Sequence, residues 1–290
     1  MRFEVAGFLR LARPANIITA HADILAGYAA APAATPAAIP FLLLATTGLY
    51  GGGVVFNDVF DAHLDATERP ERPIPSGVVS VMAAAIFGTA LLGGSVFLAW
   101  WWSPLSGIVA AAIAVAALIY DRFGKHHSML GPVNMGLCRA LNLILGVTAG
   151  GRIPGFHWLL AAVPLCYIAG ITSLSRGEVK GGTRTAAIVS GSWLAAALVL
   201  FLVVAMLEGL RAVWCLPFVA ALLFRIFSPF RNAFHSLAPA AIRLAIKTGI
   251  LSLILLNASL AAVFAGLWYA AGVLMLYVPA TLLAKIFAVT

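Results

Sequence analysis

The chain has 290 residues, of which 62% are hydrophobic and only 10% are charged, and its mean hydropathy is +1.02. This composition excludes a soluble globular protein and indicates a polytopic membrane protein. The formal net charge of +8 comes without a block of Lys and Arg beside stacking aromatic residues, so we expect no nucleic acid partner and attribute the charge to membrane topology.

Apolar runs long enough to cross a bilayer recur along the whole chain. A spanning helix needs about 20 mostly apolar residues, and short polar or Pro/Gly breaks separate the runs. The ten predicted spans cover residues 15–38, 40–57, 78–101, 104–121, 133–150, 156–175, 186–207, 211–228, 245–266 and 268–287. Backbone groups inside a bilayer must be hydrogen-bonded within the protein, so we expect an all-α bundle. Residues 229–247 carry basic side chains on an apolar background, and an interfacial helix is an open alternative there.

Basic residues collect in every second loop of this scheme. The loops on one side hold Arg2, Arg10, Arg13, Arg69, Arg72, Arg122, Lys125, Arg176, Lys180, Arg184, Arg231, Arg243 and Lys247, whereas those on the other side hold only Arg152 and Arg211. The positive-inside rule then predicts that the N-terminus and the basic loops are cytoplasmic.

Three aspartates follow the second span, within the segment Asn57 to Gly77 (NDVFDAHLDATERPERPIPSG). Helical side chains three or four positions apart share a face, so Asp58, Asp61 and Asp65 should form one acidic stripe. Such a stripe repels itself unless a cation lies between its members, and oxygen ligands suit Mg²⁺ that shares its shell with phosphate. Arg69 and Arg72 follow within reach of such phosphates. A solvated loop between two helices is the alternative interpretation.

The pattern NDxxDxxxD followed by RPIPSG resembles the first signature of the UbiA superfamily of intramembrane prenyltransferases. The resemblance implies one domain over residues 1–290, with nine or ten helices around a central cavity and one acidic signature in each half of the bundle. It also implies Mg²⁺ as cofactor and a prenyl diphosphate as donor. Asp58, Asp61 and Asp65 are then the catalytic and metal-binding residues, and Asn57 with Arg69 and Arg72 belongs to the diphosphate site.

The fourth loop and the helix after it carry further polar residues (YDRFGKHHSMLGPVNMGLCRALN). By resemblance to the superfamily, Tyr120, Lys125 and Asn134 belong to the diphosphate site. Arg139 lies in an apolar helix, where an arginine needs a partner, so we expect it to face the bundle interior toward a diphosphate or the acidic stripe. Snorkelling of Arg139 to the lipid headgroups is the alternative.

The sixth loop, TSLSRGEVKGGTRTAAIV, departs from the second acidic signature of the superfamily. Aligned on its glycine and threonine, the signature places Leu174 at the first acid and Glu178 at the second. Glu178 is then the fourth metal ligand, a second Mg²⁺ binds weakly, and Arg176 and Lys180 can take phosphate oxygens directly. The motifs SRGEVKGG and GPVNMGLCRALN look like the UbiA-like branch of bacterial Ebo-type metabolite gene clusters.

Two polar residues of the first span can line the cavity, because helical spacing puts Asn16 and Asp23 on one face. We assign both to the acceptor side of the cavity. Asp23 is either a proton acceptor for the substrate or an interhelical hydrogen-bond partner.

These observations predict an enzyme of the bacterial inner membrane that moves an isoprenoid from a prenyl diphosphate to an unidentified acceptor, in contact with membrane lipid. The degenerate second signature leaves an alternative, a non-catalytic relative that binds or helps to export a lipid-linked or aromatic metabolite. An ion-coupled transporter is disfavoured because the acids cluster at a helix end and not at mid-membrane.

Overall fold

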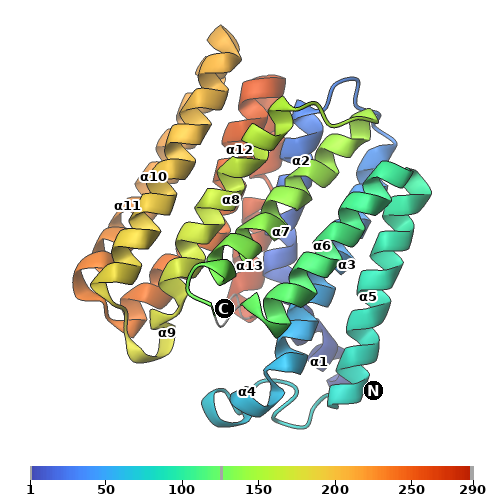
Figure 1. Ribbon diagram of the computed structural model, residues 1–290, viewed down its shortest axis with the longest axis vertical. Coiled ribbons are helices and arrows are strands. Elements are labelled where there is room, and N and C mark those ends of the chain that lie inside the picture. The colour runs from blue at the N-terminus through green and yellow to red at the C-terminus, as the bar shows by residue number, and fades with distance from the viewer. Residues whose placement is uncertain (1, 125–126, 288–290) are drawn as a thin grey trace.

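The computed structural model describes residues 2–124 and 127–287, and the elements of this described part are all helical (Figure 1). The α-helices are α1 (Arg2–Ala12), α2 (Pro14–Ala30), α3 (Ala38–Phe60), α4 (Ala62–Glu68), α5 (Val81–Trp102), α6 (Pro104–Arg122), α7 (Leu130–Val147), α8 (Phe156–Ser175), α9 (Gly177–Lys180), α10 (Arg184–Leu207), α11 (Leu216–Ser236), α12 (Pro239–Leu274) and α13 (Tyr277–Ile286). Short 3₁₀ segments, η2 (Thr148–Gly150) and η3 (Gly209–Cys215), complete the order. The predicted all-α fold class is confirmed.

Eight helical stretches of the described chain are long and apolar enough to cross a bilayer. The last of them, Pro239–Ile286, folds back on itself, as shown by the 3.1 Å hydrogen bond from Lys247 Nζ to the carbonyl of Ala284. In a straight helix these two residues would lie about 55 Å apart. The helix breaks at Gly266, whose φ of 80° and ψ of −176° suit only glycine. Counting this hairpin as two spans and adding the shorter α2 agrees with the predicted nine or ten.

Helix boundaries differ from the prediction in two regions. The first span ends at Ala30 and not at residue 38, because Pro32 and Pro36 follow and a residue before proline disfavours the helical region. Residues 229–247, for which an interfacial helix was an open alternative, form no separate helix. There α11 continues to Ser236, and α12 begins two residues after Leu237, which adopts a left-handed conformation with φ of 54°.

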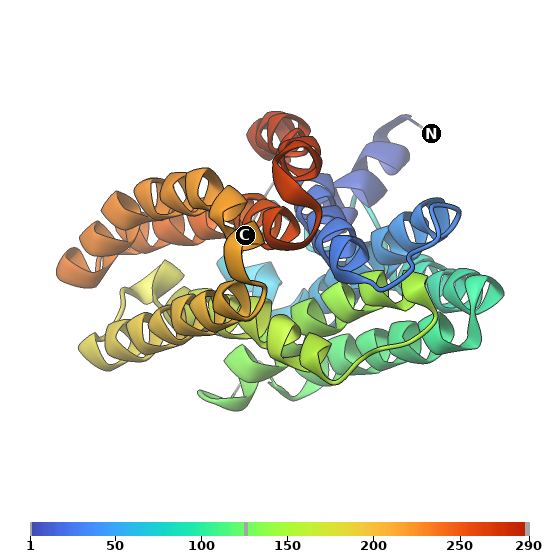
Figure 2. The ribbon, with the colours of Figure 1, turned by 90° about the horizontal axis from the view of Figure 1, so that it is seen from above.

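Most of the cavity wall comes from the centre of the bundle, where α2, α3, α6, α7, α8 and α12 lie (Figure 2). α10 packs on α8, and α11 packs on α12, so these two helices extend the bundle to one side. On the other side α5 packs on α3 and α6. The helices α10, α11 and α5 therefore support the central helices from outside.

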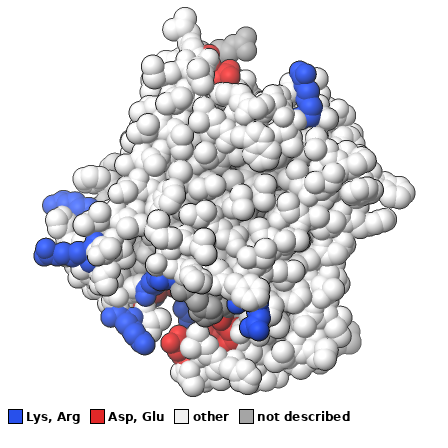
Figure 3. Space-filling view, in the orientation of Figure 1, with Lys and Arg blue, Asp and Glu red and all other residues white. Residues whose placement is uncertain are grey.

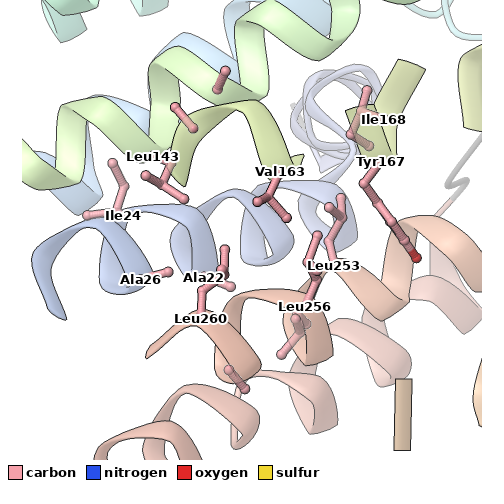
Figure 4. Packing of buried hydrophobic residues seen from close by; sticks show 14 of the residues in the cluster. Ala22, Ile24, Ala26, Leu143, Val163, Tyr167, Ile168, Leu253, Leu256 and Leu260 are labelled. Atoms are coloured by element: carbon pink, nitrogen blue, oxygen red, sulfur yellow. The ribbon is translucent and has the colours of Figure 1, made fainter. Parts of the chain in front are cut away.

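Small residues let the central helices approach closely. A Cβ atom on Gly27 would collide with the carbonyl oxygen of Leu143, and one on Gly146 would collide with that of Ile24. This is the small-residue contact that membrane helices use in place of a hydrophobic driving force. Figure 4 shows the apolar side chains around this contact, contributed by α2, α7, α8 and α12.

Charged side chains are unevenly distributed over the surface. In the view of Figure 3 they gather at the lower end, near α4 and α9 of Figure 1, while the belt above that end is almost free of them. The apolar belt and the charged end are those of an integral, multi-pass membrane protein.

Candidate active site

The bundle encloses a cavity of about 280 Å³ that reaches Glu178 on α9, at the charged end of the molecule (Figure 1). Its walls are apolar and include Leu49, Ile113, Ile168, Ile171, Ile250 and Leu253. A second hollow, of about 370 Å³, adjoins its outer end. Both hollows are lined by Arg13, Arg69, Arg72 and Glu178, and we call these four residues the mouth.

The acidic segment is built on a bend and not on one continuous helix, which corrects the predicted stripe. α3 ends at Phe60, and Asp61, with φ of −91° and ψ of 2°, joins it to α4. The backbone N–H of Asp61 still donates to the Asn57 carbonyl (3.0 Å), and that of Asp65 to the Asp61 carbonyl (2.8 Å). The near-helical spacing survives the bend, so the three aspartates remain neighbours.

A guanidinium group lies between two of the three carboxylates. Arg72 Nη1 donates to Asp65 Oδ2 at 2.6 Å and to Asp58 Oδ1 at 3.1 Å. Arg13 Nη2 donates to the same Asp58 oxygen at 2.8 Å. Both aspartates are buried. Arg13 was not predicted as a site residue, because its position before the first span marks it only as a topological charge and its contact with Asp58 joins residues 45 positions apart.

Glu178 lies across the mouth, on α9. Its carboxylate is 3.9 Å from Arg69 Nη2, and its backbone carbonyl accepts a 2.7 Å hydrogen bond from Arg243 Nη1. Burial raises the pKa of Glu178, and the positive charges of Arg69 and Arg243 oppose that rise. Arg243 was also missed, because sequence spacing did not reveal that the start of α12 meets α9.

The last turns of α3 and α6 carry a second polar pair. Asn57 Nδ2 donates to Asp121 Oδ1 at 3.0 Å, and both residues line the cavity beside Tyr120. Asp61 is close enough to interact electrostatically with Asp58 and Tyr120. Asp121 is buried and was not assigned from sequence, although it directly follows Tyr120.

Other predicted site residues lie farther from the cavity. Arg176 and Lys180 are exposed, and Arg176 is near enough to Tyr120 to interact with it electrostatically. Asn134 does not line either hollow as described, and its buried Oδ1 has no hydrogen-bond partner among the described residues. The same hollows are lined by neither Asp61 nor Asp65. Lys125 lies outside the described residues.

Arg139 pairs with Asp23 deep in the bundle. Arg139 Nη1 donates to Asp23 Oδ2 at 2.7 Å, and Asn142 donates to the same oxygen at 3.0 Å. Asn257 donates to Asp23 Oδ1 at 2.6 Å. We call these four residues the inner network. Arg139 is 4% exposed and therefore does not snorkel, and its partner is Asp23 and not the acidic stripe. Of the two roles open to Asp23, proton acceptor and interhelical hydrogen-bond partner, its contacts in the structure are those of the second.

The inner network forms the polar inner end of the cavity. Arg139 and Asn142 line it together with Asn16 and Thr46, and the Arg139 guanidinium lies 5.1 Å from the centre of the Tyr50 ring. Tyr50 precedes Asn57 by two turns of α3, which is about 10 Å. The cavity thus has apolar walls between a charged mouth and a polar inner end.

The carboxylates at and beside the mouth fit a divalent cation by chemistry but not by their present arrangement. No group of three His, Cys, Asp or Glu side chains within residues 2–124 and 127–287 is gathered closely enough to hold a metal ion. Asp58 and Asp65 nevertheless already face one common cation, the guanidinium of Arg72. Carboxylate oxygens are the ligands that Mg²⁺ prefers, so these residues can hold it once Arg72 moves aside.

The chain is thus a helical membrane bundle with an apolar cavity, and acids and arginines lie where that cavity ends. The chain matches the UbiA prenyltransferase family over residues 22–244 and belongs to that family. The expectation of an intramembrane prenyltransferase is thereby confirmed.

Individual relatives agree with this placement. The digeranylgeranylglyceryl phosphate synthase of Methanoculleus marisnigri is 30% identical over 201 residues, covering 65% of this chain and 70% of the relative. That of Metallosphaera sedula is 33% identical over 177 residues, and these cover 60% of this chain and 61% of the relative, less than two thirds of its length.

Solved structures share the fold. A UbiA homologue from Aeropyrum pernix K1 superimposes with a TM-score of 0.70 at 18% identity, covering 84% of this chain and 96% of the homologue. A UbiA homologue from Archaeoglobus fulgidus, bound to GPP and Mg²⁺, superimposes with a TM-score of 0.56 at 15% identity, covering 93% and 99%.

Proposed function

We propose that this protein binds a prenyl diphosphate together with Mg²⁺ at the mouth of its cavity and transfers the prenyl group to a small or lipophilic acceptor. The observation that carries the proposal is the meeting of the Arg13–Asp58 and Arg72–Asp65 pairs at the open end of an apolar cavity. The Archaeoglobus homologue holding GPP and Mg²⁺ in the same fold supports it.

Each charged group has a role in this proposal. Bound Mg²⁺ would neutralise charge that develops on the leaving diphosphate. The proposed metal ligands, of which the first three are also the catalytic residues, are Asp58, Asp61, Asp65 and Glu178. The proposed diphosphate contacts are Asn57, Arg69, Arg72, Tyr120, Lys125, Asn134, Arg176 and Lys180. Because Glu178 is the single carboxylate of its loop, we propose that one metal ion binds tightly and that Arg69 supplies positive charge opposite it.

The chain's own residues then organise one bond exchange. The allylic C–O bond breaks, and the diphosphate leaves with the electron pair toward the arginines of the mouth. A new bond forms from the acceptor's nucleophilic atom to the allylic carbon, and the proton that the acceptor loses passes to the released diphosphate. The apolar walls hold the isoprenoid and keep water from capturing the positively charged allyl group.

The acceptor is assigned to the inner half of the cavity. Asn16, Thr46 and Asn142 offer hydrogen bonds there. Asp23 positions Arg139 and does not face the cavity itself, whose described lining omits it. Arg139 lies too deep in the bundle to contact a diphosphate at the mouth, and we propose that it contributes to the acceptor side of the cavity.

We further propose a bacterial inner-membrane location, with the N-terminus and the mouth on the cytoplasmic side, because the basic loops are on that side. The motifs SRGEVKGG and GPVNMGLCRALN support placement in the UbiA-like branch of Ebo-type gene clusters. The whole chain would act as one domain.

The test is Mg²⁺-dependent release of diphosphate from geranylgeranyl diphosphate by the purified full chain in detergent. Wild type is compared with Asp61→Ala and with Glu208→Gln, a control at the far end of α10. Release that depends on Mg²⁺ and is abolished only by Asp61→Ala supports the enzyme. Tight binding of the donor by wild type without release, in the presence of candidate acceptors, supports the non-catalytic alternative and overturns the proposal.

A further inference from the structure

The acids that would bind metal are not free in this structure: their positive partners are arginines. Arg72 bridges Asp58 and Asp65, and Arg13 holds the other side of Asp58. Two guanidinium groups and two carboxylates make a neutral set. The side chains of Arg13 and Arg72 are only 13% and 12% exposed, so solvent screens them little.

We propose that Arg13 and Arg72 are exchangeable counter-ions, which hold Asp58 and Asp65 until Mg²⁺ arrives and then turn to the diphosphate. This inference rests on the proposed function, because it takes the diphosphate as the ligand of the mouth. Its consequence is that metal and diphosphate bind together and each binds poorly alone.

The reason is charge pairing in a partly buried site. Mg²⁺ alone would take the carboxylates and leave two nearly buried guanidinium groups without partners, which is strongly unfavourable. A diphosphate alone would bring negative charge beside Asp58 and Asp65. When both bind, the carboxylates have the metal, and the arginines have phosphate oxygens, to which guanidinium groups bind in bidentate fashion.

Arg69 of the mouth and the neighbouring Arg243 are arranged differently. Arg69 is 3.9 Å from Glu178 and its side chain is 33% exposed, so its ion pair is long and more screened. Arg243 donates to a backbone carbonyl. Releasing either of them would free no carboxylate of the aspartate segment. Arg69, three positions before Arg72 in the same loop, is therefore a matched control.

The experiment measures the binding of Mn²⁺, used in place of Mg²⁺, by electron paramagnetic resonance on the full chain in detergent. Affinity is measured with and without saturating inorganic pyrophosphate and corrected for the Mn²⁺–pyrophosphate complex in protein-free samples. We expect pyrophosphate to tighten Mn²⁺ binding to wild type by about 10- to 100-fold, within the usual range of coupling between two ligands.

Three variants identify the residues responsible. Arg72→Gln should bind Mn²⁺ alone about tenfold more tightly than wild type and lose most of the coupling, since Asp65 loses its arginine and Asp58 keeps only Arg13. Arg72→Lys should keep the weak binding of Mn²⁺ alone, because it retains the charge. Arg69→Gln should also keep it, while binding pyrophosphate less tightly. Arg13→Gln removes the other arginine from Asp58 and serves as the test variant if Arg72→Gln does not fold.

Equal Mn²⁺ affinity of wild type with and without pyrophosphate would overturn the inference. So would unchanged Mn²⁺ affinity in folded Arg72→Gln and Arg13→Gln. The outcome is separable from that of the proposed function: diphosphate release without coupling rejects only the exchange, and coupling without release supports the exchange while rejecting the enzyme.

Discussion

Two arginine–aspartate groups in this protein have ion pairs of similar length but different surroundings. At the mouth, Arg13 and Arg72 contact Asp58 and Asp65 at 2.6–3.1 Å beside two hollows. In the inner network, Arg139 contacts Asp23 at 2.7 Å, and Asp23 is 0% exposed.

The difference lies in what else each carboxylate touches. Asp23 accepts from three side chains of two helices, α7 and α12, in addition to lying on α2. Asp58 and Asp65 instead accept hydrogen bonds from Arg13 and Arg72, which lie between helices and border the two hollows. A buried carboxylate that accepts hydrogen bonds from two neighbouring helices fixes how those helices pack, whereas an ion pair that borders a cavity can change partners.

The largest expected effect comes from breaking the inner network. Asp23→Leu leaves Arg139 as an unpaired buried charge, so we expect the free energy of unfolding to fall by about 3–5 kcal/mol. Thermal unfolding in detergent measures it. The double variant Asp23→Leu/Arg139→Met should recover most of the loss, because both charges are then gone. A single variant as stable as wild type would show that the pair is not structural.

Breaking the mouth should affect activity more than stability. Asp65→Asn removes a proposed metal ligand, and we expect diphosphate release to slow by about 100-fold or more, as for the loss of one preorganised electrostatic contact. Thermal unfolding of the same sample should change less than in Asp23→Leu. The reverse order, a stability loss larger than the activity loss, would contradict the division drawn between the two groups.

A smaller effect is expected on the opposite wall of the mouth. Glu178→Gln removes a carboxylate whose ion pair with Arg69 is long, so we expect only about a tenfold slower release, roughly one contact's share of the electrostatic stabilisation. Release rates at saturating Mg²⁺ provide the comparison. Losses equal to those of Asp61→Ala would mean that both walls bind metal equally.

The smallest effect is expected at Lys180. It is exposed at the end of α9, so its attraction for a diphosphate is screened by salt. Lys180→Ala should raise the donor's KM by no more than about threefold at 0.15 M salt, and the effect should shrink further at higher salt. A large, salt-independent increase would place Lys180 in direct contact with the donor.

Sequence patterns predicted the parts of the site that are local. The spacing of Asp58, Asp61 and Asp65 correctly predicted neighbouring acids even though the helix bends at Asp61, because i to i+4 backbone contacts continue through the bend. Span lengths predicted most helix boundaries within a few residues. The first span ends earlier than predicted because Ala31, which precedes Pro32, adopts an extended conformation.

Contacts between distant segments could not be predicted in this way. Arg13 meets Asp58 over 45 positions, Asn57 meets Asp121 over 64, and Arg243 meets Glu178 over 65. Helical periodicity states which face a residue occupies, but not which other helix lies against that face. The partner of Arg139 was therefore expected in the acidic segment or the substrate and was found in α2.

The hydrogen bond from Asn257 to Asp23 joins the first membrane helix to the long helix near the C-terminus, across 234 positions. At a translation rate of about 5–20 residues per second, Asp23 waits roughly 10–50 s for this donor after leaving the ribosome. During that interval Asp23 lies in the membrane without one of its three hydrogen-bond donors. The active cavity is thus completed only when the last hairpin inserts, and a shortened chain would present an unfinished wall to the quality-control proteases of the membrane.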